Sequence, residues 1–413
     1  MIDVLSVIAE LNFGGGENRL LNFARTIDSN RFRLTVATLY SWEHPLQSQC
    51  GSMLRQFAEA GVKVHAIGLP HPRTVQGLRV VKLAGTATTL ATAIARLRQL
   101  IIFTRPQIVD AHLETALYTA VPAATSAGVP AAVTLYSELA LWKLYDSQLK
   151  QVLLPSIRRL NLRLCSAIIT DSKVRAAELE HFIGRSSPVH VIPNGVHLDK
   201  PSRSRSDVLR EFGIPGNTQA IILGQVAGLV PFKGQVVLLD AARRILDKGY
   251  DVYVLCVGYP RLGPAYPLQL RRQAEKLGIS DRVRIQAYPG NIADVWSVID
   301  IHVHASSIDS LPNAIIEGMS LGKPAVVSTA GAIPDHVENG RTGLIIQPDD
   351  PTAVADALLR LLGNEAFARQ LGRAAYQRYL ERFTPEVTTR QIESCFESMV
   401  EAHRNRRETA RSP

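Results

Sequence analysis

Short apolar runs alternate with longer segments of helical periodicity along almost the whole chain, and this alternation constrains the fold most strongly. Seven such runs in the first half are bounded by turn residues, a pattern that predicts strands. Segments of helical period lie between them, among them Glu17–Thr26, Leu83–Leu100 and Leu149–Leu164. Strands separated by helices indicate βαβ units and a parallel sheet covered on both faces. The predicted strands are Val4–Ile8, Leu34–Leu39, Val62–Ile67, Ile108–Asp110, Ala132–Leu135, Ala167–Thr170 and Val189–Ile192.

The alternation stops at Ile192–Gly195 and restarts after a polar stretch. A chain of 413 residues exceeds the size at which one hydrophobic core keeps growing, so we expect two domains. We predict an α/β protein with two Rossmann-like domains, residues 1–195 and 196–384. The final segment, 385–413, reads as a helix that ends near His403, followed by a frayed polar tail. The strands predicted for the second half are Ala220–Val226, Val252–Val257, Val283–Ile285, Ile301–Val303, Ala325–Val327 and Leu344–Ile346.

Cysteine usage and hydropathy indicate a cytoplasmic protein. The N-terminus lacks the basic region of a signal peptide and reads as a first buried strand. The longest uncharged stretch, Thr115–Ser137, is interrupted by Pro122, Gly128 and Pro130, so it predicts helix, turn and strand instead of a membrane span. The cysteines are far apart and form no CxxC pair, which predicts reduced, mostly buried thiols. They are Cys50, Cys165, Cys256 and Cys395.

The net charge of +9 is concentrated in the first half. Residues 1–200 carry 21 Lys and Arg against 14 Asp and Glu, whereas the remainder carries 25 against 23. Such an asymmetry is typical of a surface that faces an anionic partner. No nucleic-acid recognition motif accompanies it, whereas a phospholipid surface or a lipid-linked phosphate fits, and an inert basic surface is the plain alternative. Arg158, Arg159 and Arg163 lie on a predicted helix among leucines and are candidates for docking at anionic lipid.

The loop Asn12–Glu17 carries three glycines between the first strand and a helix. Glycines let the backbone approach a ligand closely, and a helix N-terminus presents unpaired N–H groups to a phosphate or a sugar hydroxyl. The dinucleotide fingerprint GxGxxG is not met, because Glu17 and Arg19 occupy the later positions. A merely tight turn is the alternative interpretation.

The segment Ser306–Lys323 places Glu317 within the first two turns of a helix that begins near Pro312. A strand ends near His304 and a loop with Asp309 follows it. Ligands of open α/β sheets bind at the carboxyl ends of the strands, where a carboxylate can accept hydrogen bonds from a ribose diol. A glutamate that complements the helix dipole is the alternative.

Lys233 and His112 each follow a predicted strand. A cation is out of place at the positive end of a helix unless an anion binds nearby, so Lys233 is a candidate phosphate ligand, with a solvated loop lysine as the alternative. A lone histidine such as His112 is more often structural than catalytic. The chain carries no Walker loop, nucleophile elbow or zinc signature.

Taken together, these segments resemble the family 4 glycosyltransferases of the GT-B fold, and the order and spacing match from about residue 5 to residue 390. The resemblance implies two Rossmann-like domains with parallel sheets facing each other across a cleft, an acceptor domain followed by a donor domain, and a last helix that returns to the first domain. The matching segments are Gly14–Glu17 with the following LLNFA, Asp110–His112, Val191–Val196, Leu229–Gln235, Ser307–Val327 and Asn339–Leu344.

The resemblance also implies a retaining transferase that needs neither a metal nor a cofactor. Lys233 would hold the donor diphosphate, Glu317 the ribose hydroxyls, and Asp309 with the loop after it the transferred sugar. His112 would lie beside the donor sugar, and the Gly15–Gly16 amides beside the diphosphate or acceptor. The donor-site residues are Gly15, Gly16, Lys233, Asp309, Ser310, Leu311, Pro312, Asn313 and Glu317, and the catalytic ones Lys233, His112 and Asp309.

Four positions depart from the family pattern. Asp309 replaces a glutamate, Asp110 stands where histidine is common, and Pro260 where glycine is usual. Gly228 replaces an arginine that contacts the diphosphate, which opens the alternative of a weakly active or inactive member. Arg261 is the candidate substitute for that arginine.

These observations predict transfer of a hexose-type sugar from a nucleoside diphosphate donor to a hydroxyl, with retention at the anomeric carbon. The expected acceptor is lipid-linked or a polysaccharide or glycolipid precursor, and the expected location is cytoplasmic, at the inner face of the membrane. A sugar-nucleotide epimerase of the same fold and a non-catalytic sugar-nucleotide-binding protein are the alternatives.

Overall fold

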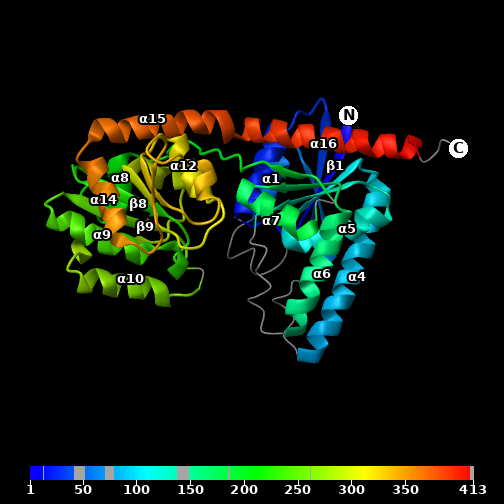
Figure 1. Cartoon of the computed structure of the whole chain (residues 1–413), viewed down its shortest axis with the longest axis horizontal. Coiled ribbons are helices and arrows are strands. Elements are labelled where there is room, and N and C mark those ends of the chain that lie inside the picture. The colour runs from blue at the N-terminus through cyan, green and yellow to red at the C-terminus, as the bar shows by residue number, and fades with distance from the viewer. Residues whose placement is uncertain are drawn as a thin grey trace. The chain divides into compact units, whose positions relative to one another are not determined.

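The computed structural model describes residues 1–12, 14–40, 52–69, 79–136, 148–184, 187–260 and 262–409 (Figure 1). The chain divides into two compact units. Unit 1 holds Met1–Gly195 together with Pro385–Pro413, and unit 2 holds Val196–Thr384.

Unit 1 is built on a seven-stranded parallel sheet in the order β3-β2-β1-β4-β5-β6-β7. The central strands are buried along their whole length, as expected for a sheet covered on both faces. Strand β1 pairs with β2 on one side and β4 on the other. Successive strands are therefore added on one side of β1 up to β3 and on its other side from β4 onward. The strands are β1 (Ile2–Ile8), β2 (Phe32–Tyr40), β3 (Lys63–Leu69), β4 (Ile108–His112), β5 (Ala131–Leu135), β6 (Ala167–Thr170) and β7 (Val189–Val191).

Seven helices are described in unit 1, and the last of them comes from the far end of the chain. Helix α16 packs against α1, where the rings of Phe23 and Phe396 meet edge to face with centroids 6.0 Å apart. This contact ties the C-terminal segment into the core beside β1. The helices are α1 (Gly15–Thr26), α3 (Leu54–Glu59), α4 (Arg79–Thr104), α5 (Leu113–Ser126), α6 (Gln148–Leu164), α7 (Lys173–Ile183) and α16 (Pro385–Thr409).

Unit 2 is built on a six-stranded parallel sheet in the order β10-β9-β8-β11-β12-β13. Its strands are β8 (Ile221–Val226), β9 (Val252–Val257), β10 (Val283–Gln286), β11 (Ile301–His304), β12 (Ala325–Ser328) and β13 (Leu344–Ile346). Its helices are α8 (Arg205–Glu211), η2 (Pro231–Lys233), α9 (Gln235–Asp247), α10 (Ala265–Lys276), η3 (Ser280–Arg282), α11 (Ile292–Val298), α12 (Asn313–Ser320), α13 (Ile333–His336), α14 (Pro351–Leu362) and α15 (Glu365–Arg382).

Both sheets have the doubly wound strand order of a Rossmann-like domain. The order reverses between β1 and β4 in unit 1 and between β8 and β11 in unit 2. Ligands of such sheets bind outside the carboxyl ends of the strands at these switch points. The two positions therefore mark where a functional site is to be sought in each unit.

The structure confirms the predicted α/β class and all thirteen predicted strands. Several boundaries differ by one or two residues; β4, for example, continues to His112, and α16 continues to Thr409 instead of ending near His403. The segment Arg404–Thr409, part of the expected frayed tail, is helical, and Arg407 within it donates to the carbonyl of Gly128 at 3.1 Å.

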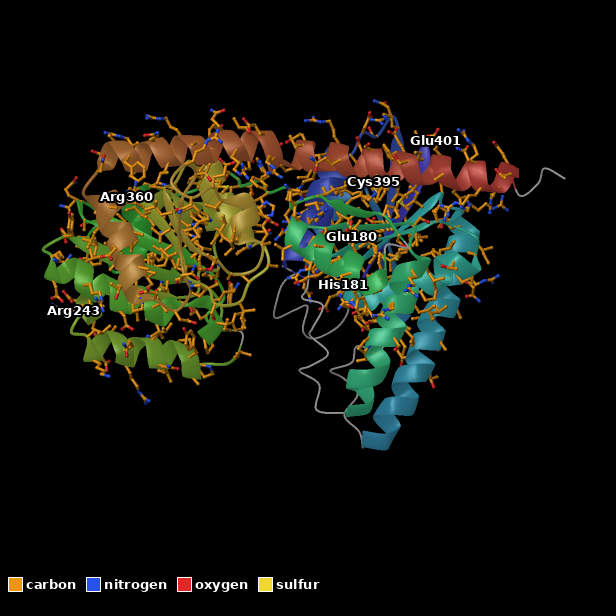
Figure 2. All side chains as sticks on the ribbon, viewed as in Figure 1. Glu180, His181, Arg243, Arg360, Cys395 and Glu401 are labelled. Carbon is orange, nitrogen blue, oxygen red and sulfur yellow. The ribbon has the colours of Figure 1, made fainter. Side chains whose placement is uncertain are left out.

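Cysteines and hydropathy follow the predictions where the structure describes them. Cys165, Cys256 and Cys395 are buried free thiols, and Figure 2 labels Cys395 on α16. Burial raises the pKa of each thiol, that of Cys256 and Cys395 to about 12. Cys50 lies outside the described residues. Within those residues, every helix is too short or too polar to cross a membrane.

Candidate functional site

Lys233 is held at the switch point of unit 2 by the glycine that follows it. Gly234 has φ 72°, and a Cβ atom there would lie 2.0 Å from the carbonyl oxygen of Ala305. Only glycine allows this close approach between the end of η2 and the residue after β11. The carbonyl of Phe232 also accepts a hydrogen bond from the N–H of Ser307 at 2.9 Å. The loop after β8 is thereby fastened to the loop after β11.

The Lys233 ammonium lies 2.5 Å from Oδ2 of Asp309, and Nε2 of His304 lies 2.8 Å from the same oxygen. The other oxygen, Oδ1, accepts the N–H of Ser310 at 3.1 Å. Burial alone would raise the pKa of Asp309, whose side chain is 7% exposed, but His304 and Lys233 lower it well below its ordinary value. The carboxylate is therefore ionised and fully engaged by protein groups in this structure.

The loop Ser310–Asn313 leads from this cluster into α12. Gly331 packs against it so closely that a Cβ there would lie 1.8 Å from the carbonyl oxygen of Asp309. Pro312 is the residue before the helix and not part of its first turn. Leu311 is buried in the core, which leaves only its backbone for contact with a ligand.

Glu317, on α12, accepts a hydrogen bond from Nε1 of Trp296 at 2.8 Å. Burial raises the pKa of Glu317, and the bond from Trp296 partly offsets this shift. Aromatic contacts connect this residue to the lysine cluster. The rings of Trp296 and His302 lie 5.0 Å apart, and those of His302 and His304 5.8 Å apart. Glu317 and Lys233 thus belong to one contiguous polar and aromatic network around β11.

In unit 1, the glycine loop ends at the start of α1. Gly14 is extended and precedes the helix, and Gly15 and Gly16 form its first turn. A Cβ on Gly16 would lie 3.2 Å from Cδ1 of Leu113, so this turn packs against the start of α5. Leu113 has φ 67°, an unusual value for a leucine. The first turn of α1 therefore lies beside the end of β4, at the switch point.

His112 is the last residue of β4 and is buried with Asp110. Its Nε2 atom lies 2.7 Å from Oδ2 of Asp110, which also accepts the hydroxyl of Ser6 at 3.1 Å. Arg19, from α1, donates to the carbonyl of Ile192 and stacks over the ring of Tyr136. The described part of this sheet edge is therefore rich in buried polar groups.

The sequence did not single out two residues that the structure adds to the candidate site. His304 completes the lysine–aspartate cluster, and Trp296 holds Glu317. His304 is a polar residue that ends a buried strand, which is the same signal that singled out His112. Trp296 carries no such signal, because its contact with Glu317 depends on how α11 packs beside α12.

The three arginines expected to dock at lipid are engaged within unit 1. Arg158 is buried and lies 2.5 Å from the carboxylate of Glu114, so this part of the prediction is wrong. Arg159 stacks over the ring of Phe182, and Arg163 donates to the carbonyl of Ile183 at 2.9 Å. These partners hold the guanidinium groups against the protein.

The carbonyl of Gly228, at the position of the absent arginine, accepts a hydrogen bond from the Gln235 side chain at 3.0 Å. Arg261, the candidate substitute, lies outside the described residues. In the parts of the chain that the structure describes, no three His, Cys, Asp or Glu side chains form a group able to hold a metal ion.

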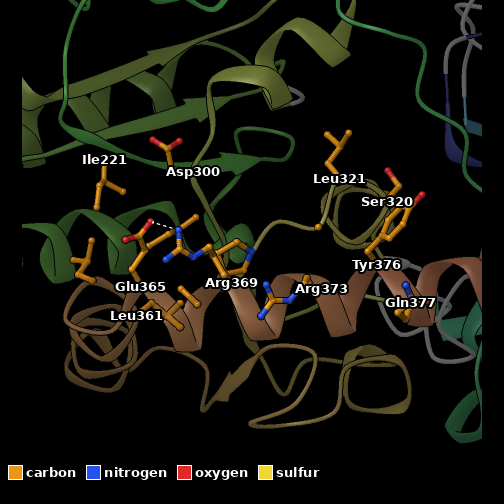
Figure 3. Close-up of a pocket in the computed structure, with 15 residues that line it drawn as sticks. Ile221, Asp300, Ser320, Leu321, Leu361, Glu365, Arg369, Arg373, Tyr376 and Gln377 are labelled. Atoms are coloured by element: carbon orange, nitrogen blue, oxygen red, sulfur yellow. Dashed lines mark ion pairs between the residues drawn. The ribbon is translucent and has the colours of Figure 1, made fainter.

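A cavity of about 930 Å³ lies at the opposite edge of the sheet in unit 2 (Figure 3). Ile221 and Ile301 line it, and these residues begin β8 and β11. Arg369 faces it from α15 but pairs with Glu365 at 2.9 Å. Because Lys233 and Asp309 follow the carboxyl ends of the same strands, this cavity is separate from the candidate site.

Two doubly wound parallel sheets with polar residues at their switch points define an α/β protein with two Rossmann-like domains. A family model described as Glycosyltransferase Family 4 matches residues 13–200, and one described as Glycosyl transferases group 1 matches residues 220–364. The chain belongs to the family 4 glycosyltransferases, of GT-B type.

Several curated relatives match part of the chain. A D-inositol 3-phosphate glycosyltransferase of Streptomyces avermitilis is 30% identical over 250 residues, which cover 58% of this chain and 53% of the relative. An N-acetyl-alpha-D-glucosaminyl L-malate synthase of Bacillus anthracis is 25% identical over 203 residues, covering 49% and 51%. The chain thus spans about half the length of the curated relatives it matches.

Solved structures share the fold along nearly the whole chain. The Anabaena protein HepE, in complex with UDP and glucose, has a TM-score of 0.75 and 21% identity over 96% of this chain and all of that one. Sucrose-phosphate synthase from Thermosynechococcus elongatus has a TM-score of 0.77 and 17% identity, covering 97% and 100%.

Proposed function

We propose that this protein is a retaining glycosyltransferase that moves a hexose-type sugar from a nucleoside diphosphate sugar to a hydroxyl acceptor. The observation that carries the proposal is the cluster of Lys233, Asp309 and His304 at the switch point of unit 2, joined to Glu317 around β11. Family membership supports it, and so does the presence of UDP and glucose in the similar HepE structure.

Unit 2 would bind the donor. Lys233 would exchange part of its contact with Asp309 for the donor diphosphate, since both partners are anionic. Glu317 would accept hydrogen bonds from the ribose hydroxyls through the carboxylate that Trp296 orients. Asp309 and the backbone of Ser310–Asn313 would surround the transferred sugar. These are the roles that the family resemblance assigns to the same residues.

Unit 1 would bind the acceptor. The first-turn amides of Gly15 and Gly16 offer N–H groups without helical partners, because the first N–H groups of any helix lack them. His112, at the end of β4, would lie beside the donor sugar. Both features stand at the switch point of the first sheet.

The proposed reaction needs neither metal nor cofactor. The bond from the anomeric carbon to the diphosphate oxygen breaks, and a new bond to the acceptor oxygen forms on the same face of the sugar. The proton of the acceptor hydroxyl passes to the departing diphosphate. Lys233 would stabilise the negative charge that develops on that diphosphate, which is the kind of electrostatic assistance that lowers such barriers most.

The proposed acceptor is lipid-linked or a polysaccharide or glycolipid precursor, reached from the cytoplasmic face of a membrane. Residues 1–200, nearly all of which lie in unit 1, carry 21 Lys and Arg against 14 Asp and Glu. Helix α6 of unit 1 exposes three apolar side chains at helical spacing, Ile157, Leu160 and Leu164, which are 43%, 61% and 40% exposed. An exposed apolar stripe on a basic unit suits contact with an anionic lipid surface.

A donor panel tests the proposal. The protein is incubated with UDP-, GDP- and ADP-hexoses, with and without membrane lipid extract, and nucleoside diphosphate and labelled product are measured. Nucleoside diphosphate release with sugar incorporated at a retained anomeric configuration supports a transferase. Isomerised donor would indicate an epimerase, and tight binding without turnover a binding protein, and either result would overturn the proposal.

A further inference from the structure

The pair formed by Asp110 and His112 departs from the family pattern, in which histidine is common at position 110. We propose that Asp110 is a positioning residue. It holds the ring of His112 in the neutral tautomer with its proton on Nε2, and it leaves Nδ1 as a hydrogen-bond acceptor for a substrate hydroxyl. The part that concerns the substrate rests on the proposed glycosyl transfer, whereas the part that concerns the tautomer does not.

The backbone brings the two side chains together. Residues 110 and 112 are two apart on β4, and alternate residues of a strand point to the same face of the sheet. Ser6 is the register partner of Asp110 on β1. It donates its hydroxyl to Oδ2 of Asp110 at 3.1 Å, and Nε2 of His112 lies 2.7 Å from that same oxygen. Oδ2 is therefore held from two strands.

The chemistry of the pair selects one tautomer. A carboxylate oxygen only accepts hydrogen bonds, so Nε2 of His112 must carry the hydrogen. Nδ1 is buried and has no hydrogen-bond partner among the described residues. A protonated ring would bury a second N–H without an acceptor, whereas the neutral ring leaves only a lone pair there. Of the two neutral tautomers, the one with its proton on Nε2 is therefore the one that Asp110 stabilises.

The unpartnered Nδ1 atom points to a ligand. Buried polar atoms in native proteins nearly always have a partner, and this one lies where ligands of doubly wound sheets bind. The residue that follows, Leu113, has a left-handed backbone conformation with φ 67°. A lone pair requires a donor, which a sugar or polyol hydroxyl supplies and an ionised phosphate oxygen does not. His112 would therefore face a hydroxyl and not the diphosphate.

The tautomer is measured directly by NMR on protein labelled with ring-15N histidine. The His112 signals are assigned by their loss in His112→Gln. We expect a pyridine-type Nδ1 and a pyrrole-type Nε2 in the wild type. In Asp110→Asn the amide can donate to the ring, which removes the preference, so the Nδ1–H form should appear. Ser6→Ala is the matched control, because it removes the other donor to Oδ2 and should keep the wild-type tautomer.

The NMR result decides the inference even if Asp110→Asn does not fold. A wild-type ring that is protonated on both nitrogens, or on Nδ1 alone, would overturn it. So would an unchanged tautomer in folded Asp110→Asn. These outcomes need no substrate, so they are independent of whether the protein transfers sugar.

A double-mutant cycle tests whether Asp110 acts through His112. It is run with the donor and acceptor that the panel selects. Asp110→Asn should lower kcat/KM roughly 10- to 100-fold, as expected for unpairing one buried hydrogen-bonding group. In a His112→Ala background the same change should have little further effect. Additive losses would show that Asp110 acts independently of His112 and would overturn the positioning role.

Discussion

At the scale of single residues, substitution of Lys233 tests the proposed chemistry most directly. Its ammonium pairs with Asp309 in this structure and would pair with the diphosphate during the reaction. Both states need the positive charge. The sequence identified the lysine from its position before a helix, but the pairing with Asp309 and His304 required the fold.

Lys233→Ala is expected to lower kcat by roughly 100-fold or more, because it removes the cation that stabilises the leaving diphosphate. Single-turnover kinetics with the selected donor measure this directly. Lys276→Ala is the control, since Lys276 is exposed on α10. Turnover within a factor of two of the wild type in Lys233→Ala would remove this residue from the site.

Glu317→Gln separates binding from stability. Burial raises the pKa of this carboxyl, so its ionised form costs folding free energy above the ordinary pKa of a glutamate. The amide has no charge and can still accept the bond from Trp296. We therefore expect an unchanged or higher Tm at pH 8 together with weaker donor binding, because charge-assisted hydrogen bonds to the ribose are lost.

Differential scanning fluorimetry and calorimetric titration with UDP measure these two effects on the same sample. The difference in Tm between Glu317→Gln and the wild type should shrink as the pH falls, because the native carboxyl then takes up its proton. Full affinity for UDP in Glu317→Gln would contradict the assignment of the ribose contact.

At the scale of elements, apolar periodicity was sufficient to find each strand in the described residues, because buried parallel strands are continuous apolar runs. The ends were less predictable. β4 extends to His112, whose Nε2 atom lies 2.7 Å from Oδ2 of Asp110 inside the protein, a pairing that sequence polarity alone cannot reveal. The loops that build the site approach each other at close glycine contacts such as Gly234 against Ala305, which apolar periodicity does not reveal.

Gly234→Ala tests how far that contact positions Lys233. The added methyl group would meet the carbonyl of Ala305, whereas Gly249→Ala, at φ 84°, would meet no atom within 4 Å. Both variants carry the cost of a left-handed alanine, about 1–2 kcal/mol. Gly234→Ala should lose more unfolding free energy than Gly249→Ala and should also lose turnover.

Urea denaturation and donor turnover of the two glycine variants provide the comparison. Equal losses in stability would mean that the loop after β11 moves aside freely. Retained turnover in Gly234→Ala would mean that the placement of Lys233 does not depend on this contact.

At the scale of the whole molecule, the chain enters unit 2 after Gly195 and returns to unit 1 at Pro385. The break in apolar alternation indicated the first crossing. The second crossing was inferred from family resemblance, because an amphipathic helix does not reveal which core it covers. Contacts such as Phe23 with Phe396 are long-range and follow only from the folded structure.

Phe396→Ala is expected to destabilise unit 1 by about 3–5 kcal/mol, the usual cost of removing a buried aromatic ring. Hydrogen exchange read by mass spectrometry should show lost protection in α1 and α16 and unchanged protection in unit 2. Leu380→Ala, which alters a half-exposed side chain on α15, is the control. Equal loss of protection in both units would contradict the division of the chain.

The proposed lipid contact is a property of the surface of unit 1. The wild-type protein should co-sediment with vesicles containing phosphatidylglycerol at low salt and be partly released at high salt. Replacing Leu160 and Leu164 together by Asp should weaken binding roughly 10-fold or more, since it removes two apolar side chains from the interface. Val174→Asp, which alters an exposed side chain on α7, is the control. No wild-type binding at low salt would end this part of the proposal.

The return of the chain to unit 1 has a consequence for biosynthesis. The ribosome synthesises α16 only after the whole of unit 2. The apolar face of α1 that α16 covers therefore stays exposed while unit 2 is being synthesised. Unit 2 is one continuous segment of the chain, so it can fold during translation. Unit 1 can complete its hydrophobic core only after α16, which carries Phe396, has left the ribosome.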